Sequence, residues 1–401
     1  MRARFFLNQP REKLKTASPP SRAALDFHRS LPGYRATPLL DAPELARSLG
    51  IGQVLVKDES NRLGLPAFKI LGASWAVYRA LTARATSAAV AEGRASGRPG
   101  PAEAGPSAGL ESSTTFDQVV RQFASLRPLT LVTATDGNHG RAVAHVAALF
   151  GLGAKIFVPA GTAQARIDGI ASEDATVEIV DGTYDEAVEC AAREGNDRCL
   201  VISDTSWHGY EQIPQWVAEG YATILWEIED ELARRGARDP DLFPVQFGVG
   251  ALATAVVRHY RAKAEAKPKI VSVEPLRAAC ALASIEAGKI VTVPGPHDSI
   301  MAGLNCGRVS MVAWPIAARG IDAFLAIPDE RAREAMRALA RLGVMAGETG
   351  AAGLAGLIEL LAGPENAQRR AELDLNQNSR ALIIVTEGAT DPESYARIVG
   401  A

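Results

Sequence analysis

Lys69 is the residue of this chain with the clearest capacity for covalent chemistry. It stands in the run Phe68-Lys69-Ile70-Leu71, after a loop and at the start of a helical pattern. A lysine among apolar neighbours tends to lose its proton, because its charged form is poorly solvated. The neutral amine can then attack a carbonyl group and form a Schiff base. Taken alone, the pattern more often marks a lysine that reaches solvent from a helix end, so the prediction depends on other clusters.

A glycine-rich turn could hold a phosphate group. Gly248, Val249, Gly250 and Ala251 follow a strand-like run and begin a helix-like one. Backbone N–H groups at a helix start bind anions, and glycines let those groups approach the ligand closely. The turn has Ala253 where a dinucleotide GxGxxG motif has its third glycine. It therefore fits one phosphate at least as well as two, and an NAD-dependent enzyme is disfavoured.

The run Thr135-Asp136-Gly137-Asn138-His139 leaves another strand-like segment and enters a helix. Backbone N–H groups at such a helix start can hold a carboxylate. Asp136 is unusual beside an anion site, because like charges repel, unless its carboxylate acts on the ligand. The local alternative is that Asp136 is a helix N-cap and Asn138 a turn residue.

Two further strand-like runs end in polar residues. Asp204 is followed by Trp207 and Tyr210, whose rings can form the wall of a small pocket, and Thr386 offers a hydroxyl to a ligand nitrogen. Each of these runs also fits a simple helix start. In open α/β sheets, ligands bind outside the carboxyl ends of the strands. Together the clusters supply an imine-forming lysine, a phosphate turn, a carboxylate-binding turn, two carboxylates and a hydroxyl, which pyridoxal phosphate requires.

Strand-like apolar runs alternate with helix-like stretches along the chain. The expected strands are residues 53–57, 129–135, 154–159, 176–180, 199–204, 243–247, 269–274, 323–327 and 381–386. The expected helices are residues 70–81, 138–150, 164–172, 185–193, 212–234, 251–262, 331–342 and 351–361. This order predicts α/β units with mainly parallel sheets flanked by helices. Uninterrupted apolar strands are typical of sheets covered on both faces.

The length of 401 residues predicts two domains. We expect residues 1–80 and 206–401 to form a large cofactor-binding domain, and residues 116–205 a smaller, mobile one. Residues 82–115 are rich in Ala, Gly, Ser and Pro and carry little periodicity, which predicts an exposed insertion.

The composition limits the classes of partner. The net charge is −3 with both signs interspersed, which argues against nucleic acid or an anionic membrane as a partner. No apolar run reaches the ~20 residues of a membrane span, and we expect a cytoplasmic protein. The 4 cysteines include no CxxC pair and the 6 histidines are scattered, so we expect no metal site and free thiols. The alternative for the thiols is that Cys280 and Cys306 pair.

The clusters together resemble the fold-type II pyridoxal-phosphate enzymes (the tryptophan synthase beta-like family) and, among them, the diaminopropionate ammonia-lyases. The resemblance extends from about Tyr34 to Tyr395, outside the insertion. The matching motifs are Lys57-Asp58-Glu59-Ser60 with Ala67-Phe68-Lys69, Ala134 to Gly140, Asp204-Thr205 with Trp207, Val273-Glu274-Pro275, Ile300 to Leu304 and Thr386-Glu387-Gly388. Asp136 is the discriminating residue, because the related serine and threonine dehydratases usually have a serine there. The chain departs from the family pattern at Ala253, where a glycine is usual, and at His208, where a glutamate is usual.

The resemblance implies a role for each cluster. It implies that Lys69 holds pyridoxal phosphate as a Schiff base, with Asp136 and Asp204 as acid/base carboxylates. The residues that it implies for cofactor binding are Asn138 at the ring oxygen, Gly248, Val249, Gly250 and Ala251 at the phosphate, and Thr386 at the pyridine nitrogen. The residues that it implies for substrate binding are Thr135, Asp136, Gly137 and His139.

The reaction that the resemblance implies is an α,β-elimination that converts 2,3-diaminopropionate to pyruvate and ammonium. The resemblance implies the D isomer, the L isomer or both as substrates, which calls for a base on each face of the α-carbon. One arrangement has Asp136 as the base for the D isomer and Lys69 or Asp204 for the L isomer, and the sequence leaves open which base serves which face. The only partners expected are the small amino-acid substrate and a second copy of the chain in a homodimer. The alternatives are a serine/threonine dehydratase, another β-eliminating enzyme of this fold, or a pyridoxal-phosphate-binding protein without activity.

Overall fold

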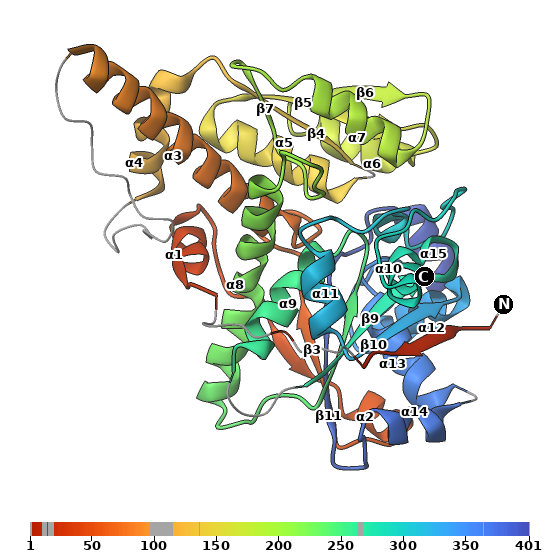
Figure 1. Ribbon diagram of the computed structural model, residues 1–401. Coiled ribbons are helices and arrows are strands. Elements are labelled where there is room, and N and C mark those ends of the chain that lie inside the picture. The colour runs from red at the N-terminus through yellow and green to blue at the C-terminus, as the bar shows by residue number, and fades with distance from the viewer. Residues whose placement is uncertain are drawn as a thin grey trace.

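Two sheets organise the chain (Figure 1). The computed structural model describes residues 2–9, 14, 20–96, 115–135, 137–263, 268–363 and 365–400. The large sheet contains, in spatial order, β1 (Arg4–Leu7), β10 (Ala323–Ile327), β9 (Lys269–Pro275), β8 (Leu242–Gln246), β11 (Arg380–Val385), β3 (Gln53–Asp58) and β2 (Leu39–Asp41). The small sheet contains β6 (Thr176–Val180), β5 (Gly153–Pro159), β4 (Thr130–Ala134) and β7 (Cys199–Val201).

The strand directions confirm the predicted α/β class. The small sheet is parallel throughout. In the large sheet only the two edge strands, β1 and β2, run antiparallel to their neighbours. All strand-like runs expected from the sequence are strands, with ends that differ by at most a few residues.

Helices connect the strands and cover both sheets. In chain order they are α1 (Ala23–Ser30), α2 (Pro43–Leu49), α3 (Lys69–Ser96), α4 (Phe116–Gln122), α5 (Asn138–Phe150), α6 (Gln164–Ala171), α7 (Tyr184–Arg193), α8 (Gln212–Arg234), α9 (Ala251–Arg261), α10 (Cys280–Ala287), α11 (Trp314–Gly320), α12 (Asp329–Arg341), α13 (Ala352–Ala362), α14 (Asn366–Glu372) and α15 (Pro392–Val399). None of the helices within the described ranges is long and apolar enough to cross a membrane.

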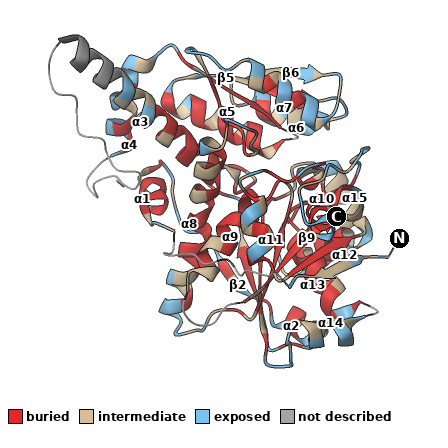
Figure 2. Ribbon diagram, in the orientation of Figure 1, coloured by how far each residue is buried: buried red, intermediate tan, exposed pale blue. Residues whose placement is uncertain are grey.

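The large sheet is buried on both faces (Figure 2). Successive side chains of a strand point to opposite faces. Leu382 and Ile384 of β11 join the apolar cluster that contains α8 and α9, whereas Ala381 and Ile383 join the cluster of α2, α12 and α13. Burial on both faces explains why these strands read as continuous apolar runs.

The small sheet lies between α5 and α7. Leu131 of β4 and Ile156 of β5 pack in the cluster of α5, while Val132 and Phe157 pack with α7. Its edge strand β6 is largely exposed, with Ile179 at 60% exposure. The long helices α3 and α8 pack against each other, and α3 also packs against α5, so these helices join the two sheets.

Helix α3 is longer than the sequence predicted. The predicted helix ended at residue 81, but α3 continues to Ser96. The start of the predicted insertion, residues 82–96, is therefore helical, and residues 97–114 lie outside the described residues. The segment is rich in alanine, which has the highest helix propensity, so it forms a helix without an amphipathic period.

A buried ion network supports the loop that precedes Lys69. Lys57 Nζ lies 2.6 Å from Glu227 Oε2, and Arg62 Nη1 lies 2.7 Å from Glu227 Oε1. Arg62 also pairs with Glu59 at 2.5 Å, and these side chains are 0–3% exposed. Burial acts to raise the pKa of Glu227, but hydrogen bonds and attraction from Arg62 and Lys57 prevail and lower it to about 2.

Replacing Glu227 by glutamine is expected to lower the free energy of unfolding by about 3 kcal/mol, because the buried Lys57 would lose its charged partner and Arg62 would keep only Glu59. The contribution of the carboxylate is present above its ordinary pKa of 4.5 and is lost as the pH falls toward 2. Urea unfolding measures the loss. The control is Glu189→Gln in the exposed pair with Arg193, where a change below about 0.5 kcal/mol is expected. Equal losses in the two variants would contradict a structural role for the network.

Candidate active site

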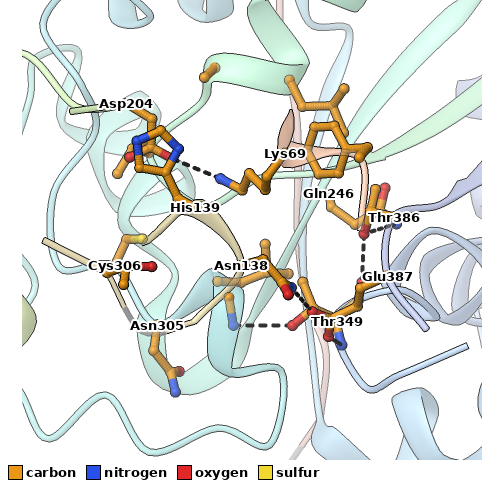
Figure 3. Close-up of a pocket in the computed structure, with 18 of the residues that line it drawn as sticks. Lys69, Asn138, His139, Asp204, Gln246, Asn305, Cys306, Thr349, Thr386 and Glu387 are labelled. Atoms are coloured by element: carbon orange, nitrogen blue, oxygen red, sulfur yellow. Dashed lines mark hydrogen bonds and ion pairs between the residues drawn. The ribbon is translucent and has the colours of Figure 1, made fainter. Parts of the chain in front are cut away.

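A cavity with an empty volume of about 800 Å³ lies where strands of both sheets end (Figure 3). Its wall contains Phe68, Lys69, Ala134, Thr135, Asn138, His139, Tyr184, Asp204, Tyr221, Gln246, Gly248, Val249, Gly250, Ala251, Leu252, Gly303, Leu304, Asn305, Cys306, Thr349, Thr386 and Glu387. The cavity thus brings together most of the residues singled out in the sequence.

Backbone hydrogen bonds fix the position of Lys69. Phe68 N donates to Thr386 O at 3.3 Å, and Gly388 N donates to Pro66 O at 2.9 Å, so the loop before Lys69 is tied to the end of β11. Helix α3 begins at Lys69 and crosses α8 closely. A Cβ at Gly220 of α8 would lie 2.4 Å from the carbonyl oxygen of Leu71, so only glycine permits this crossing.

Lys69 and Asp204 form an ion pair inside the cavity (Figure 3). Lys69 Nζ lies 2.7 Å from Asp204 Oδ2, and the two side chains are 22% and 6% exposed. The sequence predicted an apolar site for Lys69, but the structure places a buried carboxylate beside its amine. Burial acts to raise the pKa of Asp204, but the charge of Lys69 and the hydrogen bond from Lys69 prevail and lower it to about 2. Asp204 is therefore ionised at neutral pH.

A tyrosine hydroxyl holds the strand end that carries Asp204. Tyr210 Oη accepts a hydrogen bond from Ser203 N at 2.9 Å and donates to Val201 O at 2.8 Å. The ring of Tyr210 stacks on Trp207, with centroids 4.1 Å apart. These aromatic residues, expected to form a pocket wall, instead brace the segment behind Asp204.

His139 supplies a neutral acceptor beside the ion pair. Its Nε2 lies 2.8 Å from Ile202 O, and because a carbonyl only accepts, Nε2 must carry the proton. Its Nδ1 is buried and has no hydrogen-bond partner among the described residues. Burial lowers the pKa of His139, with the charge of Lys69 acting in the same direction and that of Asp204 against it.

The turn between β8 and α9 has the form of an anion cradle. Gly248, Val249, Gly250 and Ala251 line the cavity, and Gly250 has a φ of +101°, which favours glycine. A Cβ at Gly248 would lie 3.1 Å from Gly303 O, and one at Gly250 would lie 2.7 Å from the ring of Phe247. Backbone groups at the start of α9 thus approach the cavity closely, as a phosphate requires.

Thr386 lies at the end of β11 and is 2% exposed. Its Oγ1 donates to Thr349 O at 3.4 Å and accepts from Gln246 Nε2 at 3.5 Å. Both contacts are long, so this hydroxyl retains capacity for a ligand. With the lysine and the anion cradle in the same cavity, these residues fit pyridoxal phosphate, which needs an amine, a phosphate site and a partner for its ring nitrogen.

Two predicted features lie outside this cavity, and a third falls on a residue that the structure does not describe. Asp136 lies outside the described residues. Gly137 lines a neighbouring groove with Arg166 and does not line the main cavity. His208, where the chain departs from the family pattern, is exposed and does not line the cavity, so it does not alter the surroundings of Asp204.

Several cavity residues were given no role in the sequence. Glu387 stood in a noted cluster, and Gly303 and Leu304 stood in a resemblance motif. Thr349 belongs to a turn with glycines on both sides, at the start of a helix, which is a signal that could have pointed to it. Tyr221 lies in the middle of α8, and no local signal separates it from a core residue.

The cysteines carry free thiols, so Cys280 and Cys306 are not joined. Cys280 Sγ donates a weak hydrogen bond to Gly248 O at 3.6 Å, and Cys306 lines the cavity. No group of His, Cys, Asp and Glu in the described part of the chain could hold a metal ion.

Comparisons with known proteins identify the family of the chain. A family model described as pyridoxal-phosphate dependent enzyme matches residues 114–387. The chain is 34% identical over 385 residues to the diaminopropionate ammonia-lyase of Salmonella typhimurium, covering 94% of this chain and 90% of that protein.

Solved structures point to the same family. The Escherichia coli diaminopropionate ammonia-lyase in complex with D-serine is 31% identical, with a TM-score of 0.85 over 99% of this chain and 97% of that one. The same enzyme with an aminoacrylate–pyridoxal-phosphate azomethine reaction intermediate has a TM-score of 0.82, is 31% identical and covers 99% and 97% of the two chains. The chain therefore belongs to the pyridoxal-phosphate-dependent enzymes of fold type II, in the family of the diaminopropionate ammonia-lyases.

Proposed function

We propose that the protein cleaves 2,3-diaminopropionate by α,β-elimination to pyruvate and ammonium. The observation that carries the proposal is the cavity in which the Lys69–Asp204 ion pair faces the phosphate turn of Gly248 to Ala251. The names of the relatives supply the substrate. When bound, pyridoxal phosphate supplies an electron sink for the carbon that loses its proton.

In this proposal Lys69 holds the cofactor covalently and, once released by the substrate, takes or returns a proton at the α-carbon. Asp204 lies 2.7 Å from the Lys69 amine and holds it in place. The N–H groups at the start of α5, with Thr135, bind the substrate carboxylate. The neutral Nδ1 of His139 accepts a hydrogen bond from the substrate.

Asp136 is assigned to the leaving amine. An amine leaves only when it is protonated, so a carboxylate must hold it as ammonium and supply or retain a proton. Asp136 and Lys69 or Asp204 serve opposite faces of the α-carbon, which allows both enantiomers to react. The remaining assignments are Asn138 at the ring oxygen, Val249 with its neighbours at the phosphate, and Thr386 at the pyridine nitrogen.

We also propose that residues 116–205 form a smaller, mobile domain against a large one of residues 1–80 and 206–401. The proposed assembly is a homodimer, and the proposed compartment is the cytoplasm. The small sheet falls within residues 116–205, and α3 and α8 connect it to the large sheet.

The ratio of the products tests the reaction. Diaminopropionate carries two nitrogens, so its elimination releases two ammonium ions for each pyruvate, whereas serine releases one. We expect the ratio of two when the protein, loaded with pyridoxal phosphate, is supplied with diaminopropionate. Ammonium without pyruvate would contradict the elimination.

The variant Asp136→Ser is expected to lose diaminopropionate cleavage by about 10²- to 10⁴-fold, the range that a positioned acid or base contributes. A serine cannot hold the leaving ammonium by charge, but it suits the hydroxyl of serine, so slow serine dehydration is expected to remain. Steady-state kinetics on both substrates measure the change. Unchanged kinetics on diaminopropionate would remove Asp136 from the mechanism.

A further inference from the structure

Glu387 is a buried carboxylate in the cavity wall to which the proposed chemistry gives no role. It follows β11 and is 1% exposed. One carboxylate oxygen, Oε1, accepts a hydrogen bond from Thr349 N at 3.1 Å. The other, Oε2, accepts a close hydrogen bond from Asn138 Nδ2 (Figure 3). Burial of a carboxylate is costly unless it is paired, so these contacts need a reason.

The contact between Asn138 and Glu387 connects parts of the chain that belong to different sheets. Asn138 begins α5, which covers the small sheet, whereas Glu387 and Thr349 lie beside the large sheet. Asn138 and Glu387 are 249 positions apart in the sequence, and Thr349 and Glu387 are 38 positions apart. The Thr349 N–H is fixed by the backbone. The Asn138 amide is on a rotatable side chain, so of the two groups it is the one whose orientation Glu387 can set.

An ionised carboxylate only accepts hydrogen bonds, whereas an asparagine amide has a donor end and an acceptor end. The contact with Glu387 therefore selects the orientation in which Nδ2, not Oδ1, faces the carboxylate. Nδ2 carries two hydrogens, and one remains for the cavity that Asn138 lines. A negatively charged ring oxygen in the cavity would need that donor and would be repelled by Oδ1.

We propose that Glu387 is a positioning residue that turns the donor end of the Asn138 amide toward the ring oxygen of pyridoxal phosphate. The role rests on the proposed function, because that function places the ring oxygen beside Asn138. Glu387 acts through Asn138 and does not itself touch the cofactor.

The isosteric variant Glu387→Gln separates this role from simple packing. Glutamine offers one acceptor, which the fixed Thr349 N–H engages, and its amide N–H₂ then faces Asn138. The Asn138 amide is expected to turn over, so that Oδ1 faces the ring oxygen. A merely structural contact would survive this exchange, because a hydrogen bond between the two side chains is still formed.

Two measurements on the purified protein test the role. The dissociation constant for pyridoxal phosphate, titrated into the cofactor-free protein, is expected to rise at least about tenfold in Glu387→Gln, the effect of placing an unpaired acceptor against the oxygen. The absorbance of the bound cofactor is expected to shift from the long-wavelength band toward the shorter-wavelength band of the form with a neutral ring hydroxyl.

The matched control is Glu274→Gln. Glu274 is equally buried and accepts two backbone N–H groups, from Ala281 and Leu282 at 2.7 and 2.9 Å, but does not line the cavity. The Glu274→Gln variant is expected to leave the cofactor spectrum unchanged. Thermal unfolding of the cofactor-free proteins reports any loss of folding in either variant.

A double-mutant cycle with Asn138→Ala gives the decisive comparison. If Glu387 acts only through Asn138, adding Glu387→Gln to Asn138→Ala changes the dissociation constant less than about twofold. If Glu387→Gln raises the dissociation constant as much in the Asn138→Ala background as it does alone, the role is overturned. The role is also overturned if Glu387→Gln alone keeps the affinity and the spectrum of the unchanged protein. If the unchanged protein shows no absorbance of bound cofactor, the proposed function fails, and this role with it.

Discussion

The Lys69→Ala variant is expected to lose lyase activity by at least about 10⁴-fold, the upper end of what one positioned proton-transfer group contributes. The loss is expected to be this large because one side chain both holds the cofactor and moves the α-proton. Asp204 would also lose the cation 2.7 Å from its carboxylate. The absorbance of covalently held cofactor should be missing after gel filtration, and pyruvate formation measures the activity.

The control for this variant is Lys155→Ala. Lys155 is 28% exposed, close to the 22% of Lys69, and is paired with a carboxylate oxygen of Glu194 at 2.7 Å, but it does not line the cavity. It is expected to keep both the absorbance and the activity. Full activity in Lys69→Ala would contradict the covalent role of Lys69 and, with it, the proposed reaction.

The Asp204→Asn variant is expected to keep the covalently held cofactor but to lose about 10²- to 10⁴-fold in kcat/KM. Asparagine is nearly isosteric but carries no charge. The nitrogen of Lys69, whether in a protonated Schiff base or released as an ammonium group, therefore loses the negative charge that holds it in the site. Because Lys69 holds the pKa of Asp204 at about 2 in spite of its burial, the carboxylate stays ionised as the pH falls through the weakly acidic range. The kcat/KM of the unchanged protein divided by that of Asp204→Asn is therefore expected to be constant from about pH 5 to about pH 9.

The measurement is kcat/KM for diaminopropionate across that range, with Asp239→Asn as the control. Asp239 pairs with Lys263 at 2.9 Å and is 18% exposed, but it lies outside the cavity. A ratio near one for Asp204→Asn would show that this carboxylate has no part in the reaction. A ratio that falls as the medium becomes acidic would show that Asp204 titrates there and that its pKa is not depressed.

The parts of the fold that could be predicted are those with a strong local pattern. The buried parallel strands such as β8 and β11 read as continuous apolar runs because both of their faces are covered. The edge strands β1 and β2 were missed, since each is short and only partly buried. Short helices such as α2 and α14 were missed for the same reason: about two turns carry too little periodicity to be distinguished from a loop.

The site residues that could be predicted lie in short segments whose residue types indicate a function. Lys69, the glycine turn at Gly248 and Asp204 each follow or precede a strand, and parallel strands bring such ends together. The ion pair between Lys69 and Asp204 could not be predicted, because it joins residues 135 positions apart. The orientation that Glu387 imposes on Asn138 is of the same kind, since it depends on how two sheets pack.

The most direct test is to supply the protein, loaded with pyridoxal phosphate, with D-diaminopropionate, L-diaminopropionate, serine and threonine in parallel. Pyruvate, 2-oxobutyrate and ammonium are then measured. Diaminopropionate is expected to react with the highest kcat/KM and to release two ammonium ions for each pyruvate. Faster formation of 2-oxobutyrate from threonine, or of pyruvate from serine, would contradict a diaminopropionate ammonia-lyase and would identify a dehydratase.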